Sequence, residues 1–155
     1  MKTVTLDQFM SFGPCYTRER LQKIAGAKAE WSALDILALD QVPANDRLWA
    51  VLREELIDAP ILHEFACRCA EKALARVENP DPRSVAAIAA KRAWLRGEIS
   101  DEQLAAARAA ARAAAGAADR AAACADAAWA AAWAAAWAAA CADQVAILRE
   151  MLEAV

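Results

Sequence analysis

The sequence predicts an all-α protein, a single-domain helical bundle of about seven helices with a long Ala/Trp-rich C-terminal helix. About two-thirds of residues 101–142 are alanine, which has the highest intrinsic helix propensity. No stretch alternates apolar and polar residues over the length of a strand. Glycines and prolines fall mostly between segments whose apolar residues have helical spacing. The 155 residues are enough for one domain with a sizeable core.

Local signals place the first six helices. Thr5 and Gln8 form a capping box before a short helix that reaches Phe12, and Asp81 with Pro82 is a typical helix start. Gly26 and Gly97 are expected to end helices. The helices that we expect between these signals cover residues 5–12, 15–25, 27–39, 46–57, 61–77 and 82–96.

The seventh helix is the C-terminal one, residues 101–155. Ser100 and Gln103 form another capping box at its start. An unbroken helix of this length would measure about 80 Å, whereas a domain of this size has a radius of gyration of roughly 15 Å. We therefore favour a bend or a break near Gly116, between Ala113 and Asp119, with one continuous helix as the alternative.

Three tryptophans, Trp129, Trp133 and Trp137, stand four residues apart on the alanine background of this helix. With about 3.6 residues per turn they form a slowly turning stripe. The stripe continues through Cys141, Val145, Leu148 and Leu152. We interpret it as the core-facing seam of the helix; an exposed aromatic strip that grips a partner is the alternative.

Net charge argues against two classes of partner. The chain carries a net charge of −3, which suggests neither nucleic acid nor an anionic membrane. Acidic residues gather between positions 30 and 58 and are candidates for binding a protein partner, with an ordinary solvated face as the alternative: Glu30, Asp35, Asp40, Asp46, Glu54, Glu55 and Asp58. The N-terminus lacks the apolar run of a signal peptide, and the uncharged run of the tail is too short for a membrane span. We expect a cytoplasmic protein.

Catalytic and metal-binding patterns are weak. His63, the only histidine, shares a helix face with Cys67, which permits a Cys–His pair, or a zinc site if distant Cys15 joined them. Packed, reduced thiols are the more ordinary interpretation. Arg108, Arg112 and Arg120 form a basic ridge that can hold phosphate, but neighbouring aspartates favour a solvated face. No phosphate loop or dinucleotide fingerprint is present. We therefore predict no catalysis, no cofactor and no metal.

Three segments carry a family resemblance. They are residues 62–74 (LHEFACRCAEKAL), residues 79–84 (NPDPRS), and residues 94–104 (WLRGEISDEQL), which lead into the Ala/Trp tail. Over roughly residues 28–155 the chain resembles an alanine-rich family of bacterial and phage-associated proteins labelled as immunity proteins. The resemblance implies a protein that binds and silences a toxin.

Two hypotheses for function follow. The first is a non-catalytic protein-binding module that neutralises a toxin by direct contact. The second is a structural or scaffolding helical protein that assembles through its tail. An alanine-rich helix offers little apolar area per residue, so one copy leaves apolar surface uncovered. We therefore expect a homodimer through part of residues 101–155.

Overall fold

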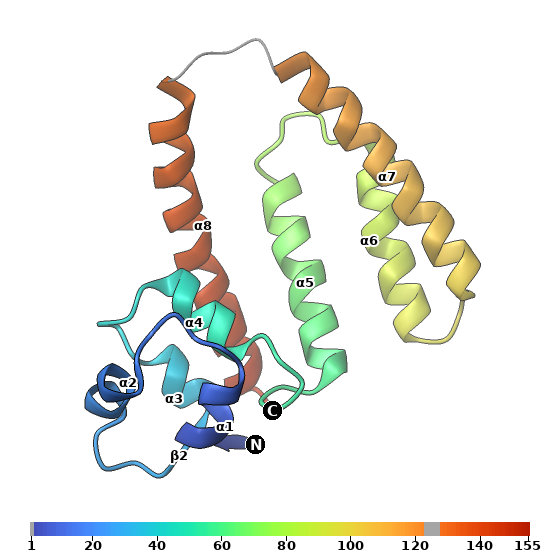
Figure 1. The fold of residues 1–155 in the computed structure, drawn as a ribbon. Helices are drawn as coiled ribbons and strands as arrows, with labels where there is room; N and C mark the ends of the chain where they lie inside the picture. The colour runs from blue at the N-terminus through green and yellow to red at the C-terminus, as the bar shows by residue number, and fades with distance from the viewer. Residues whose placement is uncertain (1, 123–127) are drawn as a thin grey trace. The chain divides into compact units, whose positions relative to one another are not determined.

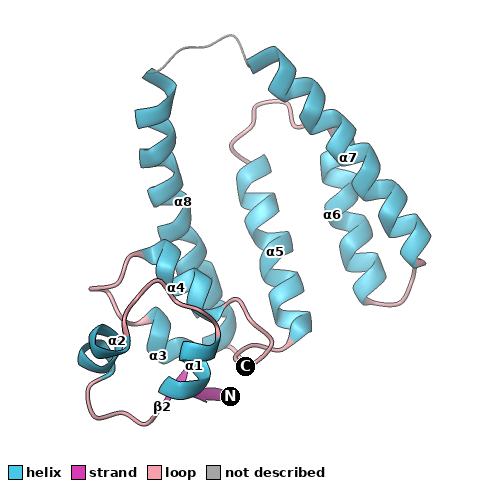
Figure 2. Cartoon of the chain, viewed as in Figure 1, coloured by secondary structure: helices cyan, strands magenta, loops and turns pink. Residues whose placement is uncertain are grey.

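The computed structural model describes residues 2–122 and 128–155, and it is mostly helical, as the sequence predicts (Figures 1 and 2). Its described elements include a two-stranded sheet, β1 (Thr3–Thr5) and β2 (Glu30–Ser32), beside eight helices. The chain forms two compact units. The N-terminal unit comprises residues 1–62 with 137–155, and the second unit comprises residues 63–136. The single domain over residues 1–155 stays a prediction.

Four short helices belong to the N-terminal unit. They are α1 (Leu6–Ser11), α2 (Arg18–Ala25), α3 (Ala33–Leu37) and α4 (Ala44–Val51). Thr5 caps α1 through the predicted capping box: the Gln8 amide donates to the Thr5 hydroxyl at 3.3 Å, and the Thr5 amide donates to the Gln8 side chain at 2.8 Å. Gly26 ends α2 with a φ of 62°, in the left-handed region that favours glycine.

The predicted helix over residues 27–39 is wrong in its first half. Residues 30–32 pair antiparallel with β1, with Val4 opposite Trp31. Helix α3 begins only after Ser32, which caps it together with Asp35. The capping box fixes the helix start at residue 33, because the capping residue must keep an extended backbone.

The core of the N-terminal unit is built from residues near both ends of the sequence. Helix α8 (Ala128–Glu153) contributes Cys141, Val145, Leu148 and Leu152, all buried, so this half of the predicted seam is confirmed. The apolar residues buried elsewhere in the unit come from β1, α3, α4 and the turn that follows α4: Val4, Ala33, Ile36, Leu37, Leu48, Ala50, Val51, Leu56 and Ile57.

The second unit contains α6 (Pro82–Leu95), α7 (Asp101–Ala122) and most of α5 (Ala59–Leu74). Helices α6 and α7 pack side by side (Figure 1). Asp81 caps α6, with Pro82 in the first turn, as predicted. Helix α7 continues through Gly116 to Ala122, so a break between Ala113 and Asp119 is wrong, whereas a bend there stays a prediction. One glycine costs only about 1 kcal/mol against an alanine background. Residues 123–127 lie outside the described part, which leaves a continuous C-terminal helix untested.

Candidate functional site

The seven acidic candidates all lie in the N-terminal unit, but they do not form one free patch. Asp35, Asp40 and Asp58 form ion pairs with Lys28, Arg47 and Lys2. Burial raises the pKa of Asp35, yet hydrogen bonds from Lys28 and Ser32 outweigh burial and lower it to about 2. These three carboxylates are therefore already paired within the unit.

The other four acids divide between internal contacts and solvent. Glu30 accepts a hydrogen bond from the Thr3 hydroxyl at 2.7 Å, across the β1–β2 pair. Asp46 accepts one from the Tyr16 hydroxyl at 2.5 Å. Glu54 and Glu55 are exposed, and within residues 2–122 and 128–155 their carboxylates have no partner. Only these two remain fully available to a partner.

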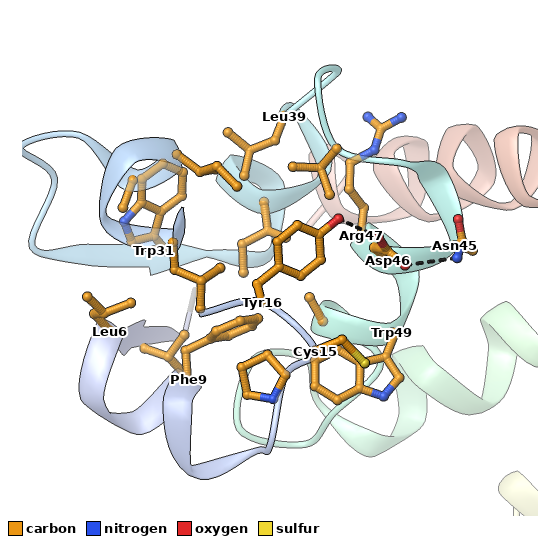
Figure 3. A pocket seen from close by; sticks show the side chains of 18 of the residues that line it. Leu6, Phe9, Cys15, Tyr16, Trp31, Leu39, Asn45, Asp46, Arg47 and Trp49 are labelled. Atoms are coloured by element: carbon orange, nitrogen blue, oxygen red, sulfur yellow. Dashed lines mark hydrogen bonds between the residues drawn. The ribbon is translucent and has the colours of Figure 1, made fainter. Parts of the chain in front are cut away.

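An apolar pocket of about 360 Å³ lies in the same unit (Figure 3). Five aromatic residues from five different segments line it: Phe9, Tyr16, Trp31, Trp49 and Trp137. Aliphatic side chains complete the wall: Val4, Leu6, Leu21, Ile24, Ile36, Leu39 and Val42. A concave, mostly apolar pocket with few polar groups is the usual form of a ligand site.

Polar groups gather on one wall of the pocket, at α4. The Tyr16 hydroxyl points toward Asp46, and the Asn45 amide donates to the other Asp46 oxygen at 2.8 Å (Figure 3). The hydrogen bond to Asp46 raises the pKa of Tyr16, so the phenol stays neutral. Both carboxylate oxygens of Asp46 are thus engaged by neutral donors.

Arg47 lines the same wall and is 12% exposed. One of its terminal nitrogens donates to the Leu37 carbonyl at 2.6 Å and to Asp40 at 2.9 Å. Its buried Nε has no hydrogen-bond partner in the described chain. A buried N–H without a hydrogen-bond partner is costly.

Basic side chains cover the aromatic rings of the pocket. The Arg20 guanidinium lies 4.3 Å from the centre of the Tyr16 ring, and Arg53 lies 4.3 Å from that of Trp49. Lys28 lies 5.5 Å from the Trp31 ring. Each distance is within cation–π range. Three of the aromatic rings at the pocket therefore already contact basic side chains of this chain.

The Cys–His pair that the spacing of His63 and Cys67 permits lies in the second unit, on α5. Burial raises the pKa of the Cys67 thiol, which opposes the thiolate that a nucleophile needs. The His63 ring packs edge-on against Trp94, with 5.9 Å between ring centres. Exposed Cys15 belongs to the N-terminal unit. Among the described residues, no three histidine, cysteine or acidic side chains come together as metal ligands.

Arg92 of α6 organises the charges of the second unit. It donates to Glu64 at 2.9 Å and also pairs with Glu71, both on α5. Hydrogen bonds from Arg92 lower the pKa of both carboxyl groups. This network joins two helices and leaves no free carboxylate for acid–base chemistry at that position.

The residues of the Ala/Trp-rich tail differ in exposure, and some of their side chains lie outside the described part of the chain. Trp137 is 58% exposed, so its assignment to the core is wrong; an alanine helix around it offers few side chains to cover an indole. The side chains of Trp129 and Trp133 lie outside the described residues, as does that of Arg120. Arg108 and Arg112 are exposed, as expected of a solvated face. None of the described helices is both long and apolar enough to cross a membrane.

Sequence reasoning missed the pocket. Its signal was the concentration of aromatic residues near arginines and lysines in the first 49 residues: Phe9, Phe12, Tyr16, Trp31 and Trp49. Each fits a local apolar pattern, so none stood out alone. No family model, curated protein or solved structure matches this chain.

Proposed function

We propose that this protein is a non-catalytic protein-binding module that neutralises a toxin by direct contact, and that the pocket of the N-terminal unit is its contact surface. The observation that carries the proposal is the apolar pocket lined by five aromatic residues. Aromatic side chains in desolvated pockets dominate the binding energy of protein interfaces. The family resemblance of residues 28–155 supplies the role of the partner.

Charge supports a protein partner with a basic surface. The N-terminal unit carries eight lysines and arginines against twelve aspartates and glutamates, a net charge of −4. Glu54 and Glu55 directly follow Arg53, whose guanidinium stacks on Trp49 at the pocket. Exposed carboxylates beside an apolar anchor site speed the association of a basic partner and fix its orientation.

Co-expression with toxins encoded beside the gene tests this function. We expect rescue of growth and a complex with one toxin. The double variant Glu54→Lys, Glu55→Lys should keep its fold and bind at least about tenfold more weakly, because charge reversal at a rim slows association. Glu150→Lys, Glu153→Lys makes the same charge change in the same unit, on α8, and should bind normally. Absence of rescue and of any complex would refute the function.

Assembly through the tail is the second candidate function. Trp137 favours it, because its indole is 58% exposed on an alanine-rich helix, and exposed apolar surface of this kind often marks a contact site. Light scattering at micromolar concentration distinguishes the two: a defined oligomer without a toxin supports assembly, whereas a mass of 16.6 kDa counts against it.

A further inference from the structure

Asp46 brings a negative charge to the pocket of the N-terminal unit. Its two oxygens accept hydrogen bonds from the Tyr16 hydroxyl and the Asn45 amide, and both of these donors are neutral. Within the described part of the chain Asp46 forms no ion pair, unlike three other carboxylates of the acidic segment. Its side chain is half-buried, so a cation that reached it would interact more strongly than in open water.

The hydrogen bonds that Asp46 already accepts leave room for such a cation. An ionised carboxylate has about four acceptor positions on its two oxygens, and the hydrogen bonds from neutral donors occupy one on each oxygen. Arg47, the next residue of α4, does not occupy the others, because it donates to the Leu37 carbonyl and to Asp40. A guanidinium or ammonium group can therefore add to Asp46 without displacing either neutral donor.

The basic side chains near the aromatic rings do not fill the pocket. Arg20, Lys28 and Arg53 contact three of the rings, but none of these three side chains lines the pocket. Arg20 and Lys28 are exposed, so water and salt weaken their repulsion of a cation inside it. The aromatic lining itself attracts cations through the negative faces of the rings.

We infer that the pocket binds a cation on an apolar stem, with the charged end against Asp46 and the stem among the aromatic and aliphatic side chains. Arginine and lysine side chains have this form, because an apolar chain of methylene groups carries the charge at its end. The pocket volume of about 360 Å³ is within the usual range of ligand sites. The preference for a cation rests on the pocket alone.

The occupant is a basic side chain of the protein partner, and this assignment rests on the proposed function. The N-terminal unit has a net charge of −4, which is the charge complement of a basic partner. Arginine is also among the residue types that contribute most to binding at protein interfaces. One basic side chain of the partner then enters the pocket, while others face Glu54 and Glu55 outside it.

Three probes with the same phenylethyl body test the charge preference on the full-length protein at neutral pH: 2-phenylethylammonium, 2-phenylethanol and 3-phenylpropionate. Two-dimensional NMR of the indole N–H signals follows binding, with two signals assigned by the variants Trp31→Phe and Trp49→Phe. We expect 2-phenylethylammonium to bind with a Kd on the order of 1 mM. The alcohol should bind at least about tenfold more weakly, because it brings no charge to Asp46, and the anion more weakly still.

Asp46→Asn removes the charge and keeps the size of the side chain. It should weaken 2-phenylethylammonium at least about tenfold, to the level of 2-phenylethanol. Binding of the alcohol should stay within about twofold, which checks that the pocket is still formed. Glu55→Gln is the matched control, because it removes one charge from the same unit at an exposed residue that does not line the pocket. It should change the affinity for the ammonium probe by less than about twofold.

Two further variants locate the probe. Ala25→Leu adds bulk at a residue that lines the pocket and should weaken 2-phenylethylammonium and 2-phenylethanol alike. Ala86→Leu makes the same change at an exposed position of α6 and should leave both affinities unchanged. If Ala25→Leu binds both probes as the unchanged protein does, the probes do not occupy this pocket and the inference is wrong.

The outcomes separate this inference from the proposed function. If 2-phenylethylammonium binds no more tightly than 2-phenylethanol, or if Asp46→Asn and Glu55→Gln weaken it equally, the preference for a cation is wrong whether or not a toxin binds. No response to any probe at about tenfold the expected Kd overturns it as well. A toxin that binds Asp46→Asn as tightly as the unchanged protein shows that its basic side chain does not reach Asp46. Absence of any toxin complex refutes the proposed function and this occupant, while the probes alone decide the preference for a cation.

Discussion

Replacing Leu148 by alanine tests whether the C-terminal half of α8 is part of the core of the N-terminal unit. Leu148 lies near the C-terminal end of the sequence, yet its side chain is 0% exposed and belongs to the same unit as β1 and α1–α4. If this packing is right, the short N-terminal helices depend on a residue near the opposite end of the sequence.

The expected cost follows from the burial. Truncating a fully buried leucine to alanine removes its transfer free energy and leaves a cavity, which costs about 2–5 kcal/mol. Total stability of a domain is about 5–15 kcal/mol. At roughly 2–4 °C per kcal/mol for a chain of this length, Tm should fall by roughly 4–20 °C.

Thermal and urea unfolding followed by circular dichroism measure the change. Leu52→Ala is the matched control, because the same atoms are removed from a side chain that is 42% exposed. It should cost less than half as much as Leu148→Ala. If the two variants melt together, or if Leu148→Ala melts within about 1 °C of the unchanged protein, α8 does not pack in the core as described.

Three further predictions concern charge and thiols. The folded-state pKa of Asp35 is lowered to about 2 from 3.8, so the stability that its charged form contributes is present above pH 4 and is lost as pH falls toward 2. The Asp35→Asn variant should therefore show a flatter dependence of unfolding free energy on pH in that window. An unchanged slope would contradict the Lys28–Asp35–Ser32 cluster. Arg92→Met leaves Glu64 and Glu71 without their shared cation and should lower the free energy of unfolding by roughly 1 kcal/mol. Arg96→Met, at an exposed pair with Glu98, should lower it by close to nothing. Equal losses of unfolding free energy in urea would argue against the network. Iodoacetamide at pH 7.5 should label exposed Cys15 well before buried Cys67 and Cys141, as read by peptide mass spectrometry, and fast labelling of Cys67 would revive a catalytic thiol.

Helix starts and ends were predictable from the sequence because their hydrogen bonds are local. The capping hydrogen bonds join residues two or three positions apart: Thr5 with Gln8, Asp81 with Arg83, and Ser100 with Gln103. Each helix start can therefore be recognised from two or three neighbouring residues of the sequence. The buried seam from Cys141 to Leu152 was equally visible, because helical spacing alone places these residues on one face.

Only the tertiary structure shows that residues 30–32 form a strand and not part of a helix. Their pairing with residues 3–5 joins segments 27 positions apart, and nothing within residues 27–39 announces it. Exposure of Trp137 was also beyond the sequence, because a stripe shows which residues share a face but not whether another element covers that face.

The pocket shows the same division. The sequence by itself determined a mostly helical chain with weak catalytic signals, an acidic segment and aromatic residues scattered through the first 49 positions. The tertiary structure decided that five of the chain's aromatic residues meet around one cavity, that three of these rings carry the chain's own cations, and that most of the acidic segment is used in internal pairs. Such arrangements depend on contacts between residues distant in sequence, which composition and spacing do not encode one segment at a time.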